Sequence, residues 1–301
     1  MTETVQARPK IGLALGGGGT RGAAHVGVLR VLVREHIPID FVAGTSIGAI
    51  IGGLYCAGVP VDQIEEMLLG RRMLHAFRTV PLPVRVAAIP VFIIPHIFGY
   101  HPYDGLYRGN KFRNYLDNSV PDSHRNIEDL STPFVAVASN LLDATPVSIS
   151  KGNLGAALQA SSAIPFLRRA VPIGDGLFVD GGIEANLPVE QARAMGANIV
   201  IAVNVDEFVH RPDPIKNFRH ILSVPPRVVS MLLAKIDEDA VKEADIVIHP
   251  DVDGITLLSS SDADGRRAIA EGEKAAEAAL PAIRARMAQA AMANDAKQPA
   301  Q

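Results

Sequence analysis

The residue of this chain whose setting best suits catalysis is Ser46, the middle of the pentapeptide Gly44–Gly48 (GTSIG), which fits the pattern GxSxG. A strand-like apolar run precedes the pentapeptide, and a helix-like apolar run that ends at Gly58 follows it. A strand that turns sharply into a helix lifts the middle residue out of the sheet, and flanking glycines allow the tight backbone. The pattern therefore predicts a nucleophilic serine at a helix N-terminus. Taken alone, it also fits a glycine-rich turn whose serine only caps a helix.

A glycine-rich segment near the N-terminus predicts a site for negative charge. Residues 10–15 form an apolar run that indicates a buried first strand, and Gly16–Gly22 (GGGGTRG) follows at once, before a run with helical apolar spacing. Successive glycines allow consecutive backbone N–H groups to point at one spot, which makes a concave anion site. Such a site can hold a phosphate group, or it can hold the oxyanion of a tetrahedral acyl intermediate.

The glycine segment fits part of a known nucleotide-binding pattern. Residues Gly17-x-Gly19-x-x-Gly22 fit the dinucleotide fingerprint, and Asp40 lies close to the expected acidic position. That acid should close the second strand, whereas Asp40 precedes the second apolar run, and the serine pentapeptide occupies the next turn. No Lys-Ser/Thr pair follows the glycines, which excludes a P-loop. A non-catalytic module that holds an anion or a nucleotide on the glycines stays open as the alternative function.

The serine needs a base, and two residues are candidates for this role. His249 ends a strand-like run, but a histidine in that position is more often structural than catalytic. Asp180 ends another apolar run and precedes Gly181 and Gly182, which again allow a tight turn. Because strand ends converge on one edge of a parallel sheet, we expect Asp180 to lie there beside Ser46 and the glycine segment.

Together these motifs resemble those of the bacterial patatin-like phospholipases, a family that uses a Ser-Asp dyad without histidine. The family signatures GGGxRG, GxSxG and Asp-Gly-Gly/Ala correspond to Gly17–Gly22, Gly44–Gly48 and Asp180–Gly182, and residues 160–165 (ASSAIP) add to the similarity. The resemblance covers about residues 10–280 and implies a lipid acyl hydrolase with Ser46 as nucleophile and Asp180 as base. The oxyanion hole that it implies consists of the backbone amides of Gly17, Gly18, Gly19 and Arg21, with Gly22, Gly44, Gly48, Gly181 and Gly182 as supporting motif residues.

A Ser-Asp dyad places a physical demand on the site. A free aspartate has a pKa near about 3.9 and is a weak base for a serine hydroxyl, so the site must bury the carboxylate to raise its basicity. We therefore expect the rate to fall as the pH drops through the pKa of Asp180, without a histidine step near about 6.5. Neither a metal ion nor a cofactor is expected, since the dyad carries out the chemistry.

The alternation of strand-like and helix-like runs predicts an α/β fold, with a mostly parallel central sheet sandwiched by helices in a patatin-like three-layer arrangement. Further buried runs at 134–138, 199–205 and 246–248 supply additional strands. We expect a flexible N-terminus over residues 1–9, one catalytic domain over 10–290 and a flexible tail over 291–301. The Ala-rich segment 256–293 should be helical, with a break near Pro281.

Composition agrees with a cytoplasmic enzyme. The formal net charge of −3 does not suggest a nucleic acid partner, and the polar residues 1–9 lack the apolar segment of a secretory signal. The single cysteine, Cys56, excludes an internal disulfide and lies in an apolar helix-like run, which indicates a buried thiol.

The least typical part of the sequence is a cap-like, partly apolar and basic insertion over about residues 67–125. Its first part, residues 67–103, contains four arginines and no acidic residue, and the strongly apolar stretch within it is broken by prolines, which argues against a membrane span. One interpretation is a cap over the sheet or a subunit interface. The other is a surface that docks on anionic lipid and makes the protein peripheral at the inner face of the membrane.

Overall fold

The computed structural model describes residues 8–77, 107–219, 224–259 and 261–295 of the 301-residue chain. Most of the 67–103 segment lies outside the described residues, and so do the hypotheses that rest on it: a cap, a subunit interface and a lipid-docking surface. The first seven and last six residues of the two expected tails lie outside as well.

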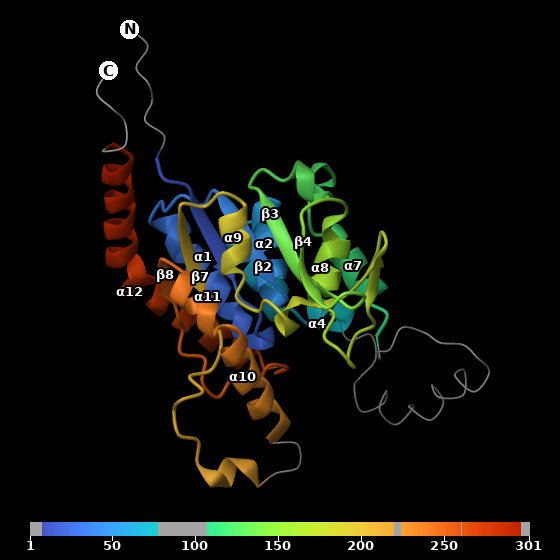
Figure 1. The fold of residues 1–301 in the computed structure, drawn as a ribbon. Coiled ribbons are helices and arrows are strands. Elements are labelled where there is room, and N and C mark those ends of the chain that lie inside the picture. Colours follow the sequence, from blue (N-terminus) through green and yellow to red (C-terminus); the bar gives the residue numbers. More distant parts are fainter. Residues whose placement is uncertain (1–7, 78–106, 220–223, 260, 296–301) are drawn as a thin grey trace, which may run out of the picture.

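Within this part of the chain, the strands belong to one 8-stranded sheet flanked by helices (Figure 1). The strands are β1 (Ile11–Leu15), β2 (Phe41–Thr45), β3 (Phe134–Asn140), β4 (Thr145–Ile149), β5 (Val171–Ile173), β6 (Gly176–Asp180), β7 (Ile199–Val203) and β8 (Ile246–Ile248). The α-helices are α1 (Ala24–Arg34), α2 (Ile47–Cys56), α3 (Val61–Leu69), α4 (Arg71–Phe77), α7 (Asn110–Asp117), α8 (Leu154–Ser161), α9 (Val189–Ala194), α10 (Val224–Ile236), α11 (Glu238–Glu243) and α12 (Asp262–Asp295). Short 3₁₀ turns are η1 (Gly19–Ala23), η2 (Asp122–His124), η3 (Ile127–Asp129), η4 (Gly181–Ile183) and η5 (Ile215–Phe218).

The strand order is β5-β6-β3-β2-β1-β7-β8, and β4 pairs with β3 beside this path. Strands β3, β2, β1, β7 and β8 are mutually parallel, whereas β4, β5 and β6 add antiparallel pairs at one side of the sheet. The predicted fold class, an α/β protein with a mostly parallel central sheet, is confirmed. The buried runs expected at 134–138, 199–205 and 246–248 are the strands β3, β7 and β8.

Helices cover both faces of the sheet because strand side chains alternate between the two faces. On one face, large residues of β1 and β7 such as Leu13 and Ile201 share a core with α1, α2, α8 and α12. On the other face, small residues such as Ala14 and Ala202 pack against α9 and α11. Figure 1 shows α9 and α11 on the near side of the sheet. Cys56 is buried in the first of these cores, as the sequence predicted.

The strand that carries Asp180 does not follow the expected parallel arrangement. Ala136 of β3 pairs with β2 on one side and β4 on the other, whereas Ala138 pairs with Asp180 of β6 on one side and β4 on the other. Strands β2 and β6 therefore lie along the same edge of β3 and run toward each other. They meet end to end, with Thr45 and Asp180 paired to consecutive residues of β3. The expectation that Asp180 follows a parallel strand is wrong, but an antiparallel strand that stops at this level brings it to the same place.

The C-terminal helix also differs from the prediction. Helix α12 continues through Pro281 to Asp295, so it has no break at the proline and includes the first residues of the expected tail. Proline removes one backbone hydrogen bond and usually kinks a helix. Burial of Ala276 and Ile283 on either side of Pro281 explains the continuity, because packing against the core holds both halves in line. Among the described helices, none combines the length and the apolar character needed to cross a bilayer.

Candidate active site

Ser46 lies in the sharp turn between β2 and α2. Its backbone has φ 53° and ψ −118°, a positive φ that is rare for a residue other than glycine. The flanking glycines are required by close contacts: a Cβ on Gly44 would lie 2.6 Å from the backbone of Ala49, and one on Gly48 would lie 2.2 Å from the carbonyl oxygen of Leu15. The turn therefore holds the serine in a strained conformation at the N-terminus of α2, as expected for a strand–turn–helix pentapeptide.

Asp180 meets this serine directly. Ser46 Oγ donates a hydrogen bond of 2.6 Å to Asp180 Oδ2, and the backbone N–H of Gly182 donates one of 2.9 Å to Asp180 Oδ1. Both side chains are buried, with 7% and 8% of each residue exposed. Burial raises the pKa of the Asp180 carboxyl to about 6, although the hydrogen bonds from Ser46 and Gly182 oppose this rise. The carboxylate is thus a stronger base than a free aspartate and is aimed at the serine hydroxyl.

Ser161 at the end of α8 fixes the backbone of the turn that contains Ser46. The backbone N–H of Ser46 donates to Ser161 Oγ at 2.9 Å, and Ser161 Oγ donates to the carbonyl oxygen of Val137 on β3 at 2.6 Å. A second link joins the two turns of the site, since Thr45 Oγ1 donates to the carbonyl oxygen of Ala185 at 2.8 Å. These contacts lock the position of Ser46 relative to the central strand.

The glycine segment approaches the same place from β1, but its amides are not equivalent. The N–H of Gly17 donates to the carbonyl oxygen of Asn186 at 3.1 Å, and the N–H of Arg21 donates to the carbonyl oxygen of Gly18 at 3.2 Å. Within the described part of the chain, the N–H groups of Gly18 and Gly19 have no acceptor. Of the four amides that the resemblance implied, two are therefore engaged in holding the loop and two are open.

Steric contacts explain why this segment is built from glycine. A Cβ on Gly18 would lie 2.6 Å from the side chain of Val205. Gly19 has φ 55°, and a Cβ there would lie 2.0 Å from the carbonyl oxygen of Leu257. Gly22 packs directly on Ile47, the residue after the serine. On the other side of the site, a Cβ on Gly181 would lie 2.4 Å from a β3 carbonyl oxygen.

The buried side chains of Arg21 and His25 anchor the glycine segment. Arg21 is only 1% exposed and donates to the carbonyl oxygen of Ile255, to Ser230 Oγ and to Glu207. Its side chain thus ties the loop to α10 and to the segment after β8. His25 Nε2 donates to the carbonyl oxygen of Gly16 at 2.8 Å, and burial lowers the pKa of His25 to about 4, so its ring is neutral at physiological pH.

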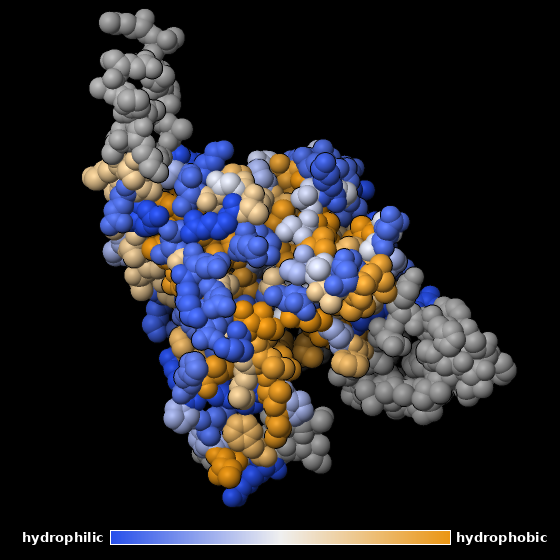
Figure 2. Space-filling view, viewed as in Figure 1, coloured by the Kyte–Doolittle hydropathy of each residue, from blue (hydrophilic) through white to orange (hydrophobic). Residues whose placement is uncertain are grey.

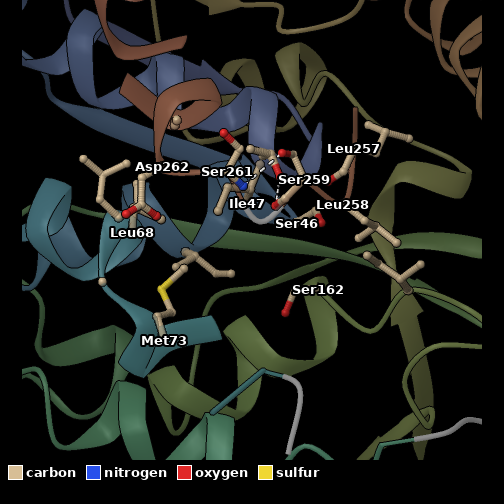
Figure 3. A pocket seen from close by; sticks show the side chains of 18 of the residues that line it. Ser46, Ile47, Leu68, Met73, Ser162, Leu257, Leu258, Ser259, Ser261 and Asp262 are labelled. Atoms are coloured by element: carbon tan, nitrogen blue, oxygen red, sulfur yellow. Dashed lines mark hydrogen bonds between the residues drawn. The ribbon is translucent and has the colours of Figure 1, made fainter. Parts of the chain in front are cut away.

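A cavity of about 620 Å³ opens on Ser46 (Figure 3). Leu68 and Met73 line one side of it and Leu257 and Leu258 the other, and Ser162 also lines it. The remaining lining includes further apolar side chains from α2 and α7, and a polar rim of Ser259, Ser261 and Asp262. Such a volume with apolar walls and few polar groups is typical of a site for a small ligand or one apolar chain.

Comparison with known proteins assigns this arrangement to a family. A family model described as patatin-like phospholipase matches residues 13–193, which is more than half of the chain. The chain belongs to the patatin-like phospholipase family. The matched residues contain the glycine segment, Ser46 and Asp180, and the family predicted from the motifs is confirmed.

Two relatives of this patatin-like phospholipase chain are much longer than the stretch that they share with it. Patatin-like phospholipase domain-containing protein 7 of Mus musculus is 32% identical over 199 residues, which are 65% of this chain and 13% of that protein. Lysophospholipase NTE1 of Mycosarcoma maydis is 33% identical over 197 residues, which are 65% of this chain and 10% of that protein. The chain thus spans a small part of these relatives. Both are eukaryotic, so they do not test the bacterial part of the resemblance.

A solved structure with a similar arrangement is VipD from Legionella pneumophila. It aligns with a TM-score of 0.50 and covers 92% of this chain and 67% of the VipD chain, with 13% sequence identity. At this identity the similarity concerns the fold alone.

The structure separates the two candidate bases of the patatin-like phospholipase chain. His249 bonds through Nε2 to the carbonyl oxygen of Asp206 at 2.9 Å and stacks on Phe208, with ring centroids 4.0 Å apart. The His249 ring thus packs against the segment that follows β7, whereas Asp180 contacts Ser46. The sequence analysis did not assign roles to Ser161 or His25. The ASSAIP motif pointed to Ser161, but no pattern marked His25 because its partner is a backbone carbonyl.

Proposed function

We propose that this chain is a serine hydrolase that cleaves fatty-acyl esters of phospholipids or lysophospholipids through a Ser46–Asp180 dyad. The observation that carries the proposal is the 2.6 Å hydrogen bond between Ser46 Oγ and Asp180 Oδ2 beside a largely apolar cavity. Family membership and relatives named phospholipase and lysophospholipase support a lipid ester as the substrate.

In the acylation step, Asp180 takes the proton of the Ser46 hydroxyl while Ser46 Oγ bonds to the carbonyl carbon of the ester. The carbonyl π electrons move to its oxygen and form a tetrahedral oxyanion. Collapse of this intermediate breaks the bond to the alcohol oxygen, which receives the proton from Asp180 and leaves. Water then attacks the carbonyl carbon of the acyl-serine and gives a proton to Asp180. The second tetrahedral intermediate collapses, Ser46 Oγ receives the proton from Asp180, and the fatty acid is released.

The oxyanion requires donors that are free before the reaction. We assign this role to the N–H groups of Gly18 and Gly19, because the amides of Gly17 and Arg21 are already bonded within the loop. Each preorganised donor of this kind contributes about 3 kcal/mol to stabilisation of the transition state. Gly17 and Arg21 would then position the donors without contacting the substrate.

The lining of the cavity supports a place for the acyl chain. Apolar side chains of α2, α3 and α4, among them Ile50, Leu68 and Met73, form a wall that suits a hydrocarbon chain. The polar side chains of Ser259, Ser261 and Asp262 lie at the rim and suit the alcohol part of the ester. An ester bond held between the apolar wall and the polar rim would lie over Ser46.

Labelling with a fluorophosphonate probe tests this function. We expect one adduct on Ser46, identified by mass spectrometry of the modified peptide, and loss of labelling in Ser46→Ala. Asp180→Asn should slow labelling by about 100-fold or more, because general-base assistance is lost. Ser162→Ala is the matched control: this serine also lines the cavity, but its hydroxyl donates to the carbonyl oxygen of Leu158 and should not affect labelling.

The alternative function, an anion-binding or nucleotide-binding module, predicts a different pattern. The open amides of Gly18 and Gly19 would hold a phosphate group, and neither Ser46 nor Asp180 would be needed. A folded chain that stays unlabelled with and without detergent, but binds a nucleotide in a manner that Gly19→Ala removes, would contradict the hydrolase proposal.

A further inference from the structure

The arrangement of polar and apolar side chains on helix α10 is the reverse of that on an ordinary surface helix. A surface helix normally buries its apolar face and exposes its polar face. In α10 the buried side contains Ser230, and the buried Asp237 follows at the end of the helix. The outward side is apolar; we call it the α10 face, and it consists of Val224, Val228, Val229, Met231, Leu232 and Ile236, which are between 36% and 59% exposed.

The apolar surface extends beyond the helix itself. Ile215 in η5 is 76% exposed, and Phe218 of the same turn borders a shallow hollow next to Val224, Val228 and Met231. Figure 2 shows apolar side chains gathered over α10, below the main body of the molecule. Contiguous apolar patches of several hundred Å² are uncommon on monomeric soluble proteins and usually mark an interaction site.

Basic residues also occur in this part of the chain. Residues 208–236 contain five Lys or Arg residues and one Asp, and acidic residues border the segment at 206–207 and 237–239. Arg211, Arg227 and Lys235 form ion pairs with acidic neighbours, and Arg219, next to Phe218, is exposed. Apolar side chains bordered by basic ones match the layered chemistry of an anionic bilayer surface, where acyl chains lie beneath negatively charged head groups.

The inner side of α10 contacts both turns that carry the dyad and its oxyanion donors. Ser230 Oγ accepts a hydrogen bond from Arg21, which anchors the glycine segment. The helix also packs on η4, the turn that begins directly after Asp180. Since an α-helix is about 10–12 Å across, the α10 face lies about one helix diameter from the catalytic turns. A surface bound to this face would therefore lie close to the active site.

We propose that the α10 face docks this protein on an anionic lipid bilayer, so that the active site meets its substrate at the membrane surface. The choice of a bilayer over a protein partner rests on the exposed Arg219 beside the apolar patch, on the contact between α10 and the catalytic turns, and on the lipid substrate proposed above. In this orientation the apolar side chains enter the acyl boundary and the basic side chains contact the head groups.

The test is sedimentation with vesicles, carried out on the Ser46→Ala chain so that binding is measured without turnover. Vesicles of phosphatidylcholine alone are compared with vesicles that also contain phosphatidylglycerol. Val228→Glu combined with Leu232→Glu places two negative charges on the α10 face. Val33→Glu is the matched control, because Val33 is 44% exposed and Val228 is 45% exposed, but Val33 lies at the far end of α1.

We expect the chain to bind the anionic vesicles more strongly, with partitioning reduced about tenfold or more by the double variant and unchanged by Val33→Glu. Turnover is measured on chains that retain Ser46. There the Val228→Glu, Leu232→Glu double variant should hydrolyse a water-soluble short-chain ester at the wild-type rate but lose activity on vesicles. Equal binding by the double variant, or no binding to anionic vesicles, would overturn the docking proposal.

Other outcomes separate the two proposals. Hydrolysis of the soluble ester without vesicle binding leaves the hydrolase standing and removes the docking surface. Vesicle binding that depends on the α10 face, without any Ser46 adduct, keeps the docking surface and removes the hydrolase. Self-association that the double variant abolishes, with no vesicle binding, would assign the α10 face to a second copy of the chain instead.

Discussion

The buried charge of Asp180 should destabilise the fold at neutral pH, and its removal should reveal by how much. Burial raises the pKa of this carboxyl from 3.8 to about 6, a shift that corresponds to a free energy on the order of 3 kcal/mol. The folded protein thus keeps the proton of Asp180 to a higher pH than the unfolded chain does. This contribution favours the folded state fully below about pH 4 and is lost as the pH rises through about 6.

Asp180→Asn removes the titration while keeping the shape of the side chain. We expect the free energy of unfolding of this variant, relative to that of the wild-type chain, to be about 3 kcal/mol larger at pH 8 than at pH 4, so the variant gains relative stability as the pH rises. Urea unfolding followed by circular dichroism at both pH values measures the difference.

Ser46→Ala supplies the control for this measurement. It keeps the carboxyl but removes the hydrogen bond that lowers the pKa of Asp180, so the pH dependence should be at least as large as in the wild-type chain. A relative stability of Asp180→Asn that does not change between pH 4 and pH 8 would show that the carboxylate is not desolvated, and it would refute the proposed basicity.

Three further predictions concern turnover and the loops that support it. Turnover of a fatty-acyl ester should fall about tenfold for each pH unit below about 6, because only the ionised Asp180 acts as base. A rate profile from pH 4 to 8 measures this fall, and an unchanged rate at pH 5 would contradict the prediction. Gly19→Ala should lower activity by about 100-fold or more and destabilise the fold by about 2–4 kcal/mol, because a Cβ would clash with the Leu257 carbonyl at a positive φ. Kinetics and thermal unfolding of that variant measure both effects, and wild-type turnover would contradict the steric requirement for glycine at this position. Ser161→Ala should lower kcat by about tenfold or more while leaving KM near its wild-type value, because the Ser46 amide loses its acceptor.

Local motifs made much of this site predictable from the sequence. The turn around Ser46 follows from the glycines on both sides, since their backbone contacts tolerate no Cβ. The first strand and the glycine segment follow from an apolar run and an uninterrupted series of glycines. These features depend on neighbours in sequence, so the sequence contains their full signal.

Features that depend on distant parts of the chain were not predictable in this way. The antiparallel direction of β6 is set by its pairing with β3, which no residue near Asp180 encodes. The engagement of the Gly17 amide depends on Asn186, far along the chain. Helix α12 passes Pro281 because the core holds both sides of it, and a propensity argument at the proline does not include that packing. The reversed polarity of α10 becomes visible only once the buried side of the helix is known.

We propose that Asp180, and not a histidine, activates Ser46. The most direct measurement compares kcat/KM on one fatty-acyl ester for the wild-type chain, Asp180→Asn and His249→Gln. We expect a loss of about 100-fold to 10,000-fold for Asp180→Asn and a wild-type value for His249→Gln. Turnover that is abolished by His249→Gln and retained by Asp180→Asn would contradict the dyad.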